Sequence, residues 1–110
     1  MLLTNKVRSK YNAIKTEVNG ITFDSKKEAS IYNELLLRGK AGEIHSLSLQ
    51  VPIYFKCNGV FCFKYIADFK YYDNKLGDWV ILDAKGILTD VYRLKKKLIE
   101  AQFGIKIIER

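Results

Sequence analysis

The chain has 110 residues, 48% of them apolar and 28% charged, with one proline, which predicts a single globular domain over 1–110 and excludes a disordered tail. Its net charge of +7 favours an anionic partner, with nucleic acid ahead of a membrane surface. No apolar run approaches the length of a membrane span, and residues 1–3 are too few for the apolar part of a signal peptide, so we expect a cytoplasmic protein.

The first expected elements are a basic arm, a short strand and a helix. Residues 1–20 carry basic side chains with little apolar periodicity, which predicts an arm that orders on a ligand and leads into a core over 21–110. A short strand is expected at 21–23. Ser25 and Glu28 have the spacing of a capping box, so a helix should begin at Ser25 and end at about residue 38, before a glycine.

Three strands are expected next. The runs 48–56, 61–72 and 79–85 are rich in β-branched and aromatic residues, which favour strands. Pro52 places the first of these strands near a sheet edge or at a strand start.

A second helix and a final strand complete the chain. Apolar residues recur at helical spacing from residue 89 or 90 to about 103, Gly104 is a natural C-cap, and residues 105–108 form a short apolar run. The order of elements is therefore α, β, β, β, α, β, which predicts an α/β fold with a mixed sheet.

The cysteines and the histidine indicate no metal site of their own. Cys57 and Cys62 flank an Asn-Gly turn that would place Cys57 opposite Val60, so we expect reduced thiols packed as small apolar side chains. His45 is the only histidine, which excludes a monomeric site that needs two, and we expect it at the surface or in a loop.

Two acidic residues on neighbouring strands form the most informative pattern. A hairpin centred between Lys75 and Leu76 places Asp68 opposite Asp83, with Cβ atoms roughly 5 Å apart, where like charges destabilise a sheet. Alternation along the strand puts Lys85 on the same face as Asp83. A divalent cation would compensate this repulsion.

A third acid lies on the core-facing side of the first helix. At about 100° per residue, Glu28 falls near the middle of an apolar arc. The arc consists of Ala29, Ile31, Tyr32, Leu35 and Leu36. A buried carboxylate needs a cation or hydrogen-bond donors. Alternatively, Glu28 folds back onto the amide of Ser25.

The second helix has a similar arc, which includes Val91, Tyr92, Leu94, Leu98, Ile99, Ala101 and Phe103. Lys95 and Gln102 lie inside it; Lys95 either reaches the site or packs its stem and keeps its ammonium in water. Basic residues of the arm and of the outer helix faces are the expected DNA contacts: Arg8, Lys10, Lys15, Lys26, Lys27, Arg93, Lys96 and Lys97.

Glu28 on the first helix, Asp68 on the second strand and Asp83-Ala84-Lys85 on the third, in this order of elements, resemble the PD-(D/E)XK nuclease superfamily. Its members include restriction enzymes, archaeal-type Holliday-junction resolvases and the endonuclease subunit of a bacterial transposase. Segments 23–29 and 91–95 also resemble a family of small, mostly phage-encoded proteins described as a domain of unknown function. One departure is an alanine, in place of proline, before Asp68.

The resemblance implies a restriction-endonuclease-like αβββαβ core that binds Mg²⁺ or Mn²⁺. Asp68, Asp83 and the backbone carbonyl of Ala84 would hold the ion, with Glu28 contributing directly or through water. Lys85 would orient or deprotonate the attacking water. Auxiliary roles at the site are expected for Gln50, Tyr92 and Lys95.

The function expected from these observations is metal-dependent DNA endonuclease activity, structure-selective like that of Holliday-junction resolvases, in phage recombination or replication. Two cuts at a junction imply a homodimer. Alternatives within this class are a general nicking or double-strand nuclease and a transposase-like subunit. Alternatives from other classes are a non-catalytic basic DNA-binding or recombination accessory module and a protein that acts on RNA.

Overall fold

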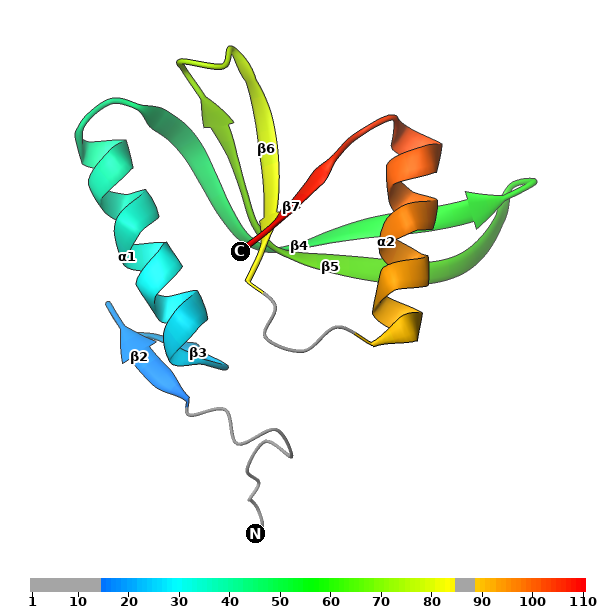
Figure 1. The fold of residues 1–110 in the computed structure, drawn as a ribbon, viewed down its shortest axis with the longest axis horizontal. Helices are drawn as coiled ribbons and strands as arrows, with labels where there is room; N and C mark the ends of the chain where they lie inside the picture. The colour runs from blue at the N-terminus through cyan, green and yellow to red at the C-terminus, as the bar shows by residue number, and fades with distance from the viewer. Residues whose placement is uncertain (1–14, 85–88) are drawn as a thin grey trace, which may run out of the picture.

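A four-stranded mixed sheet carries two helices in the computed structural model, which describes residues 15–84 and 89–110 (Figure 1). In chain order the elements are β2 (Thr16–Val18), β3 (Ile21–Phe23), α1 (Lys26–Lys40), β4 (Ile44–Cys57), β5 (Val60–Asp73), β6 (Asp78–Asp83), α2 (Asp90–Phe103) and β7 (Ile107–Glu109). The main sheet has the order β4-β5-β6-β7; its first two pairs are antiparallel and its last pair is parallel. The predicted fold class and the predicted order of elements are confirmed.

The helix caps follow the expected chemistry. Ser25 Oγ accepts a hydrogen bond from the backbone N–H of Glu28 at 3.1 Å, and Thr89 Oγ1 accepts one from Tyr92 at 3.1 Å. Gly104 ends α2 in the left-handed conformation, with a φ of 64°, as predicted. The end of α1 differs from the prediction, because the helix continues through Gly39 to Lys40.

Several strand boundaries also differ from expectation, and β6 ends at Asp83 instead of residue 85. β4 begins at Ile44 instead of residue 48, and β7 covers Ile107–Glu109 instead of 105–108. Part of the expected arm is β2, which pairs with β3 across a tight Asn-Gly turn. The other residues of the arm, 1–14, lie outside the described part of the chain, as do residues 85–88.

Both predicted hairpin registers are confirmed. Cys57 pairs with Val60 in the β4–β5 hairpin. In the β5–β6 hairpin Asp73 pairs with Asp78, and the same register brings Asp68 level with Asp83. Cys57 and Cys62 are free thiols, as expected, but they are exposed instead of packed. The reason is that the tip of the β4–β5 hairpin reaches past α2 (Figure 1), and residues 56–62 are all exposed.

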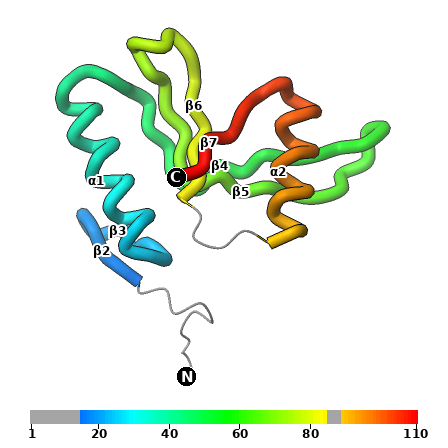
Figure 2. Tube along the Cα trace, in the orientation of Figure 1, coloured from blue at the N-terminus to red at the C-terminus, as the bar shows by residue number. Residues whose placement is uncertain are grey.

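The buried core consists of two clusters, one with α1 and one with α2. Phe69 and Tyr71 of β5 belong to the α1 cluster, whereas Tyr65 and Ala67 belong to the α2 cluster. In an unbroken strand, alternate residues share one face. The regular alternation therefore changes at Asp68, between these two pairs. Figure 2 shows the two helices over separate parts of the sheet.

The predicted apolar arc of α2 is only partly buried. Val91 and Leu94 are 61% and 59% exposed, Phe103 is exposed as well, and Ile99 is the one fully buried apolar residue of the helix. The physical reason is that α2 packs mainly on β4 and β5, and this narrow hairpin contacts only a thin stripe of the helix. Neither α1 nor α2 combines the length and apolar composition needed to cross a bilayer, and no other helix occurs in the described chain.

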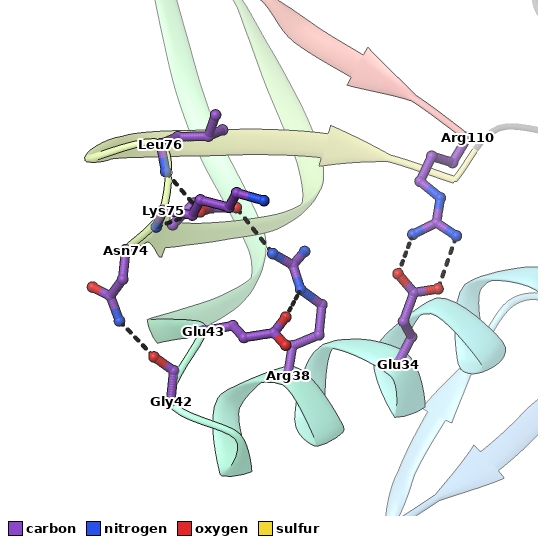
Figure 3. A network of polar contacts seen from close by, with 9 residues as sticks. Glu34, Arg38, Gly42, Glu43, Asn74, Lys75, Leu76 and Arg110 are labelled. Atoms are coloured by element: carbon purple, nitrogen blue, oxygen red, sulfur yellow. Dashed lines mark hydrogen bonds and ion pairs between the residues drawn. The ribbon is translucent and has the colours of Figure 1, made fainter.

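Ion pairs fasten α1 to the sheet and to the end of the chain (Figure 3). Arg38 donates to Glu43 Oε1 and to Asp73 Oδ2, both at 3.0 Å, and Arg110 donates two hydrogen bonds to Glu34 at 2.8 and 2.9 Å. The backbone N–H of Arg110 also donates to the carbonyl of Asp83 at 2.9 Å. These contacts fix α1 and β7 relative to the end of β6, where the acidic residues lie.

Candidate functional site

Three of the four buried acidic side chains in the described residues are those that the sequence predicted. Glu28, Asp68 and Asp83 are 6%, 6% and 0% exposed, and they come from α1, β5 and β6. The fourth, Asp73, accepts hydrogen bonds from Arg38 and from its own turn, so its role is structural. A buried carboxylate is costly unless donors or cations surround it, and the partners of the other three define the candidate site.

Glu28 faces the sheet, as predicted from its position in the helical arc. The Ser25 cap fixes the first turn of α1 and holds the backbone of Glu28. The carboxylate accepts a hydrogen bond at its Oε2 from Gln50 Nε2, at 3.1 Å. Glu28 therefore connects α1 to β4.

Gln50 lies between two of the acids. Its neighbours pair in register, Leu49 with Phe69 and Val51 with Ala67, so Gln50 is level with Asp68. Gln50 Nε2 is 3.1 Å from Glu28 Oε2 and 3.5 Å from Asp68 Oδ1. One amide group therefore donates toward two carboxylates, which offsets part of their repulsion. Gln50 is itself exposed, whereas both of these acids are buried.

The backbone of Gln50 is unusual in the same place. Its φ is 52°, in the left-handed region that residues other than glycine rarely adopt. This conformation interrupts the alternation of β4 at the level where β5 changes core cluster, at Asp68. The distorted backbone turns the amide of Gln50 toward Glu28 and Asp68.

The carboxylates of Asp68 and Asp83 each accept a hydrogen bond from the backbone at the other residue's strand. Asp83 Oδ1 accepts a hydrogen bond from the backbone N–H of Asp68 at 2.9 Å, and Asp68 Oδ2 accepts one from the backbone N–H of Ala84 at 2.8 Å. The predicted proximity of the two acids is confirmed. Backbone amides therefore offset part of the carboxylate repulsion for which we expected a cation.

Two tyrosines complete the surroundings of Asp83. Its Oδ2 accepts hydrogen bonds from the hydroxyl of Tyr65 and, at 3.1 Å, from that of Tyr92. Burial, followed by the hydrogen bond to Asp83, raises the pKa of Tyr65 above its ordinary value. Burial is also the main reason that the pKa of Tyr92 is raised. Both hydroxyls therefore stay protonated and act as donors.

A charged chain leads from Asp83 to the surface. The hydroxyl of Tyr92 is 3.0 Å from Glu109 Oε2, and Lys96 Nζ lies 3.4 Å from the same oxygen. Lys96 therefore differs from its expected place on a solvated basic face, because its half-buried ammonium pairs with Glu109. Sequence reasoning missed Tyr65 and Glu109. The signal for Tyr65 was that a tyrosine on a core-facing strand position needs a partner for its hydroxyl.

Several predicted residues are not part of this arrangement. The ammonium of Lys95 lies over the Phe63 ring, 5.5 Å from its centre, and outside the hydrogen-bonded set. Lys15 pairs with Asp24 at 3.1 Å. The exposed basic residues include Lys26 and Lys27 on α1 and Arg93 and Lys97 on α2. The predicted residues Arg8, Lys10 and Lys85 lie outside the described residues.

The carboxylate and carbonyl oxygens of the site are of the chemical type that binds a hard divalent cation, but only some of them point to a common position. Carboxylate and carbonyl oxygens are the ligands that Mg²⁺ and Mn²⁺ prefer. Glu28 and Asp68 both direct an oxygen toward the amide of Gln50, which occupies the position between them. Asp83 points instead to the tyrosines, and no three Asp, Glu, His or Cys side chains within 15–84 and 89–110 converge as metal ligands.

The comparisons with known proteins give one match. The family described as "Protein of unknown function (DUF1064)" matches residues 8–107. No curated protein and no solved structure matches the chain. Since the match spans nearly all of the 110 residues, the protein belongs to the DUF1064 family.

Proposed function

We propose that this protein is a metal-dependent DNA endonuclease of the PD-(D/E)XK type, which hydrolyses phosphodiester bonds without a covalent intermediate. The observation that carries the proposal is a single hydrogen-bonded set in the middle of an αβββαβ core. Glu28, Gln50, Asp68 and Asp83 belong to this set and come from α1, β4, β5 and β6. Burying three acids at one level of a sheet costs free energy, and a sheet with only a structural role gains nothing in return.

The residues have distinct proposed roles. Asp68, Asp83, the carbonyl of Ala84 and Glu28 would hold Mg²⁺ or Mn²⁺, which when bound lowers the pKa of a water and neutralises charge on the phosphate. Gln50 orients Glu28 and Asp68 and faces solvent, where the substrate would enter. We assign to Lys85 the orientation or deprotonation of the attacking water.

The charge of the protein supports DNA as the substrate. The net charge is +7, and exposed basic side chains occur on both helices, Lys26 and Lys27 on α1 and Arg93 and Lys97 on α2. Phosphate contacts of this kind position a duplex without reading its sequence. We therefore propose a structure-selective enzyme of phage recombination or replication in the host cytoplasm, a homodimer because resolution of a junction needs two cuts.

Cleavage assays with matched variants test the proposal. Wild type, Glu28→Gln and Asp68→Asn are incubated with branched, nicked and linear DNA and with RNA duplexes, each with Mg²⁺ or with EDTA. We expect cleavage by wild type only, with Mg²⁺, and at least a hundredfold loss in both variants. Glu17→Gln, at an exposed position of β2, is the control and should cleave normally. Equal cleavage by wild type and Asp68→Asn would overturn the proposal.

One observation favours the accessory DNA-binding module as a second candidate. The carboxylate of Asp83 accepts hydrogen bonds from a backbone N–H and two tyrosines, so its burial is compensated by neutral donors without an ion. This alternative predicts DNA binding without cleavage. It also predicts no heat of Mg²⁺ binding in calorimetry, whereas the endonuclease predicts Mg²⁺ binding that Glu28→Gln weakens.

A further inference from the structure

Three aromatic rings lie side by side across three neighbouring strands of the main sheet. His45 on β4 pairs with Tyr72 on β5, and Tyr72 pairs with Trp79 on β6. The ring centroids are 4.9 Å apart between His45 and Tyr72 and 5.4 Å apart between Tyr72 and Trp79. We call these three side chains the aromatic ladder.

The aromatic ladder lies on the sheet face that α1 does not cover. The residues next to it in sequence, Ile44, Tyr71 and Val80, are buried in the α1 cluster, so alternation places the ladder on the opposite face. His45 is exposed, Tyr72 is half-buried and Trp79 is 49% exposed. This exposure is large for a tryptophan, a residue that normally buries most of its surface.

Positive charge accompanies the exposed rings. The ammonium of Lys70 lies 4.8 Å from the centre of the Trp79 ring. Lys70 and Trp79 also line an open pocket together with Leu76, Asp78, Lys106 and Ile108, so two lysines face one acid there. Exposed rings beside lysines are the usual features of surfaces that bind unpaired nucleic acid, because bases stack on the rings while ammonium groups contact phosphates.

We propose that the aromatic ladder with Lys70 binds unpaired bases of a nucleic acid strand. Paired bases are excluded, because a duplex hides their faces. An apolar peptide would make no use of the excess positive charge that two lysines and one acid give the pocket. Cross-strand aromatic contacts also stabilise a sheet. That role requires neither an exposed indole nor a lysine above it.

The position of the ladder also indicates a substrate class, an inference that rests on the proposed endonuclease function. Trp79 and Asp83 are four residues apart on β6, about 13 Å along a strand, at positions that alternate to the same face. A strand stacked on the ladder would run along β6 toward the end where Asp83 lies beneath Tyr65 and Tyr92. The substrate class is therefore DNA with unpaired bases next to the scissile bond, as at a flap, a gap or an open branch point.

Binding without cleavage tests the ladder on its own. Trp79 is the only tryptophan, so its fluorescence reports contact directly. In EDTA, a short oligothymidine should quench the fluorescence of wild type. A duplex should bind with little quenching. By anisotropy of a labelled oligothymidine, Trp79→Leu should lose about tenfold or more in affinity, since one base–aromatic stack contributes about 1–3 kcal/mol.

Matched controls separate the possible outcomes. Phe61→Leu removes an exposed aromatic ring at the far end of the β4–β5 hairpin and should bind oligothymidine like wild type. Circular dichroism and urea unfolding of both variants establish that they fold. If folded Trp79→Leu binds as tightly as wild type, or if oligothymidine does not quench wild type, the ladder proposal is wrong. If quenching occurs but no DNA is cleaved, the endonuclease proposal fails and the ladder proposal stands.

Discussion

Asp83 depends on its tyrosine donors, because the carboxylate is fully buried. Tyr65→Phe removes one hydroxyl donor and leaves the ring in place. We expect the free energy of unfolding to fall by about 1–3 kcal/mol, the usual cost of a buried acceptor that loses a partner. Urea unfolding measures the change, with Tyr54→Phe on the exposed side of β4 as the control. A stability equal to wild type would mean that Tyr65 does not hold Asp83.

Gln50 supplies a direct test of metal binding at the site. Gln50→Glu places a third carboxylate beside Glu28 and Asp68, so in EDTA we expect a loss of about 1–3 kcal/mol in the free energy of unfolding. A bound cation stabilises the folded state by RT ln(1 + c/Kd), where c is the concentration of free Mg²⁺, so tighter binding gives greater stabilisation. Millimolar Mg²⁺ should therefore raise the melting temperature of Gln50→Glu more than that of wild type.

The control for this test is Gln102→Glu, at an exposed position on α2. This variant should respond to Mg²⁺ no more than wild type does. If Mg²⁺ does not change the melting temperature of Gln50→Glu, the proposed ligand set is wrong.

Asp73 should make the stability of the folded protein depend on pH. The backbone N–H of Leu76 is the main cause that lowers the pKa of its carboxyl from the ordinary 3.8, and hydrogen bonds from Arg38 and Lys75 add to it. A lowered pKa in the folded state stabilises the protein above the ordinary pKa, and this stabilisation is lost as the pH falls through the folded-state value. Wild type should therefore lose stability below about pH 4.

Urea unfolding at neutral pH and at about pH 3 measures this effect. Asp73→Asn should be less stable than wild type at neutral pH and should lose less stability on acidification. Some acid dependence should persist, because the hydrogen bond from Arg110 also lowers the pKa of Glu34. Asp24→Asn, at an exposed position, should keep the pH dependence of wild type.

At the scale of elements, the N-cap of α1 connects local sequence to the site. Ser25→Ala removes the acceptor for the N–H of Glu28, and we expect it to lower the free energy of unfolding by about 1 kcal/mol. Ser30→Ala, in the exposed middle of α1, should leave stability unchanged or raise it slightly, because alanine favours helix. A neutral Ser25→Ala would show that tertiary packing alone fixes the start of α1.

Local chemistry made most elements of the fold predictable. The predicted caps at Ser25 and Gly104 and the two hairpin turns depend only on neighbouring residues, and the structure contains each of them. The hairpin register then placed Asp68 beside Asp83, since a turn centre fixes which residues oppose each other. Helical periodicity placed Glu28 on the buried face of α1.

Features that depend on tertiary contacts were not predictable from the sequence. The positive φ of Gln50 and the change of core cluster at Asp68 break the alternation that strand predictions assume. The buried stripe of α2 depends on how much of the helix the hairpin contacts, so Val91 and Leu94 were wrongly assigned to the core. Glu109 reaches Tyr92 only because β7 lies beside β6.

At the scale of the whole molecule, the two helices lie over separate parts of the sheet (Figure 1), and both carry exposed basic residues. Lys26 begins α1, two residues before Glu28, and Arg93 is in the first turn of α2, next to Tyr92. Both side chains are exposed. A DNA strand that reaches the acidic site would therefore have its phosphates close to both helix starts.

Salt dependence tests this arrangement without any cleavage. Each phosphate that a protein cation neutralises releases counterions, so the logarithm of the association constant falls with the logarithm of salt concentration by about 0.9 per contact. In EDTA, Lys26→Gln and Arg93→Gln should each weaken DNA binding and reduce the slope by about 0.9. Lys40→Gln, about 18 Å from Glu28 at the other end of α1, should leave the slope unchanged. If all three variants have the slope of wild type, DNA does not lie across the two helix starts, and the basic surface used must be elsewhere.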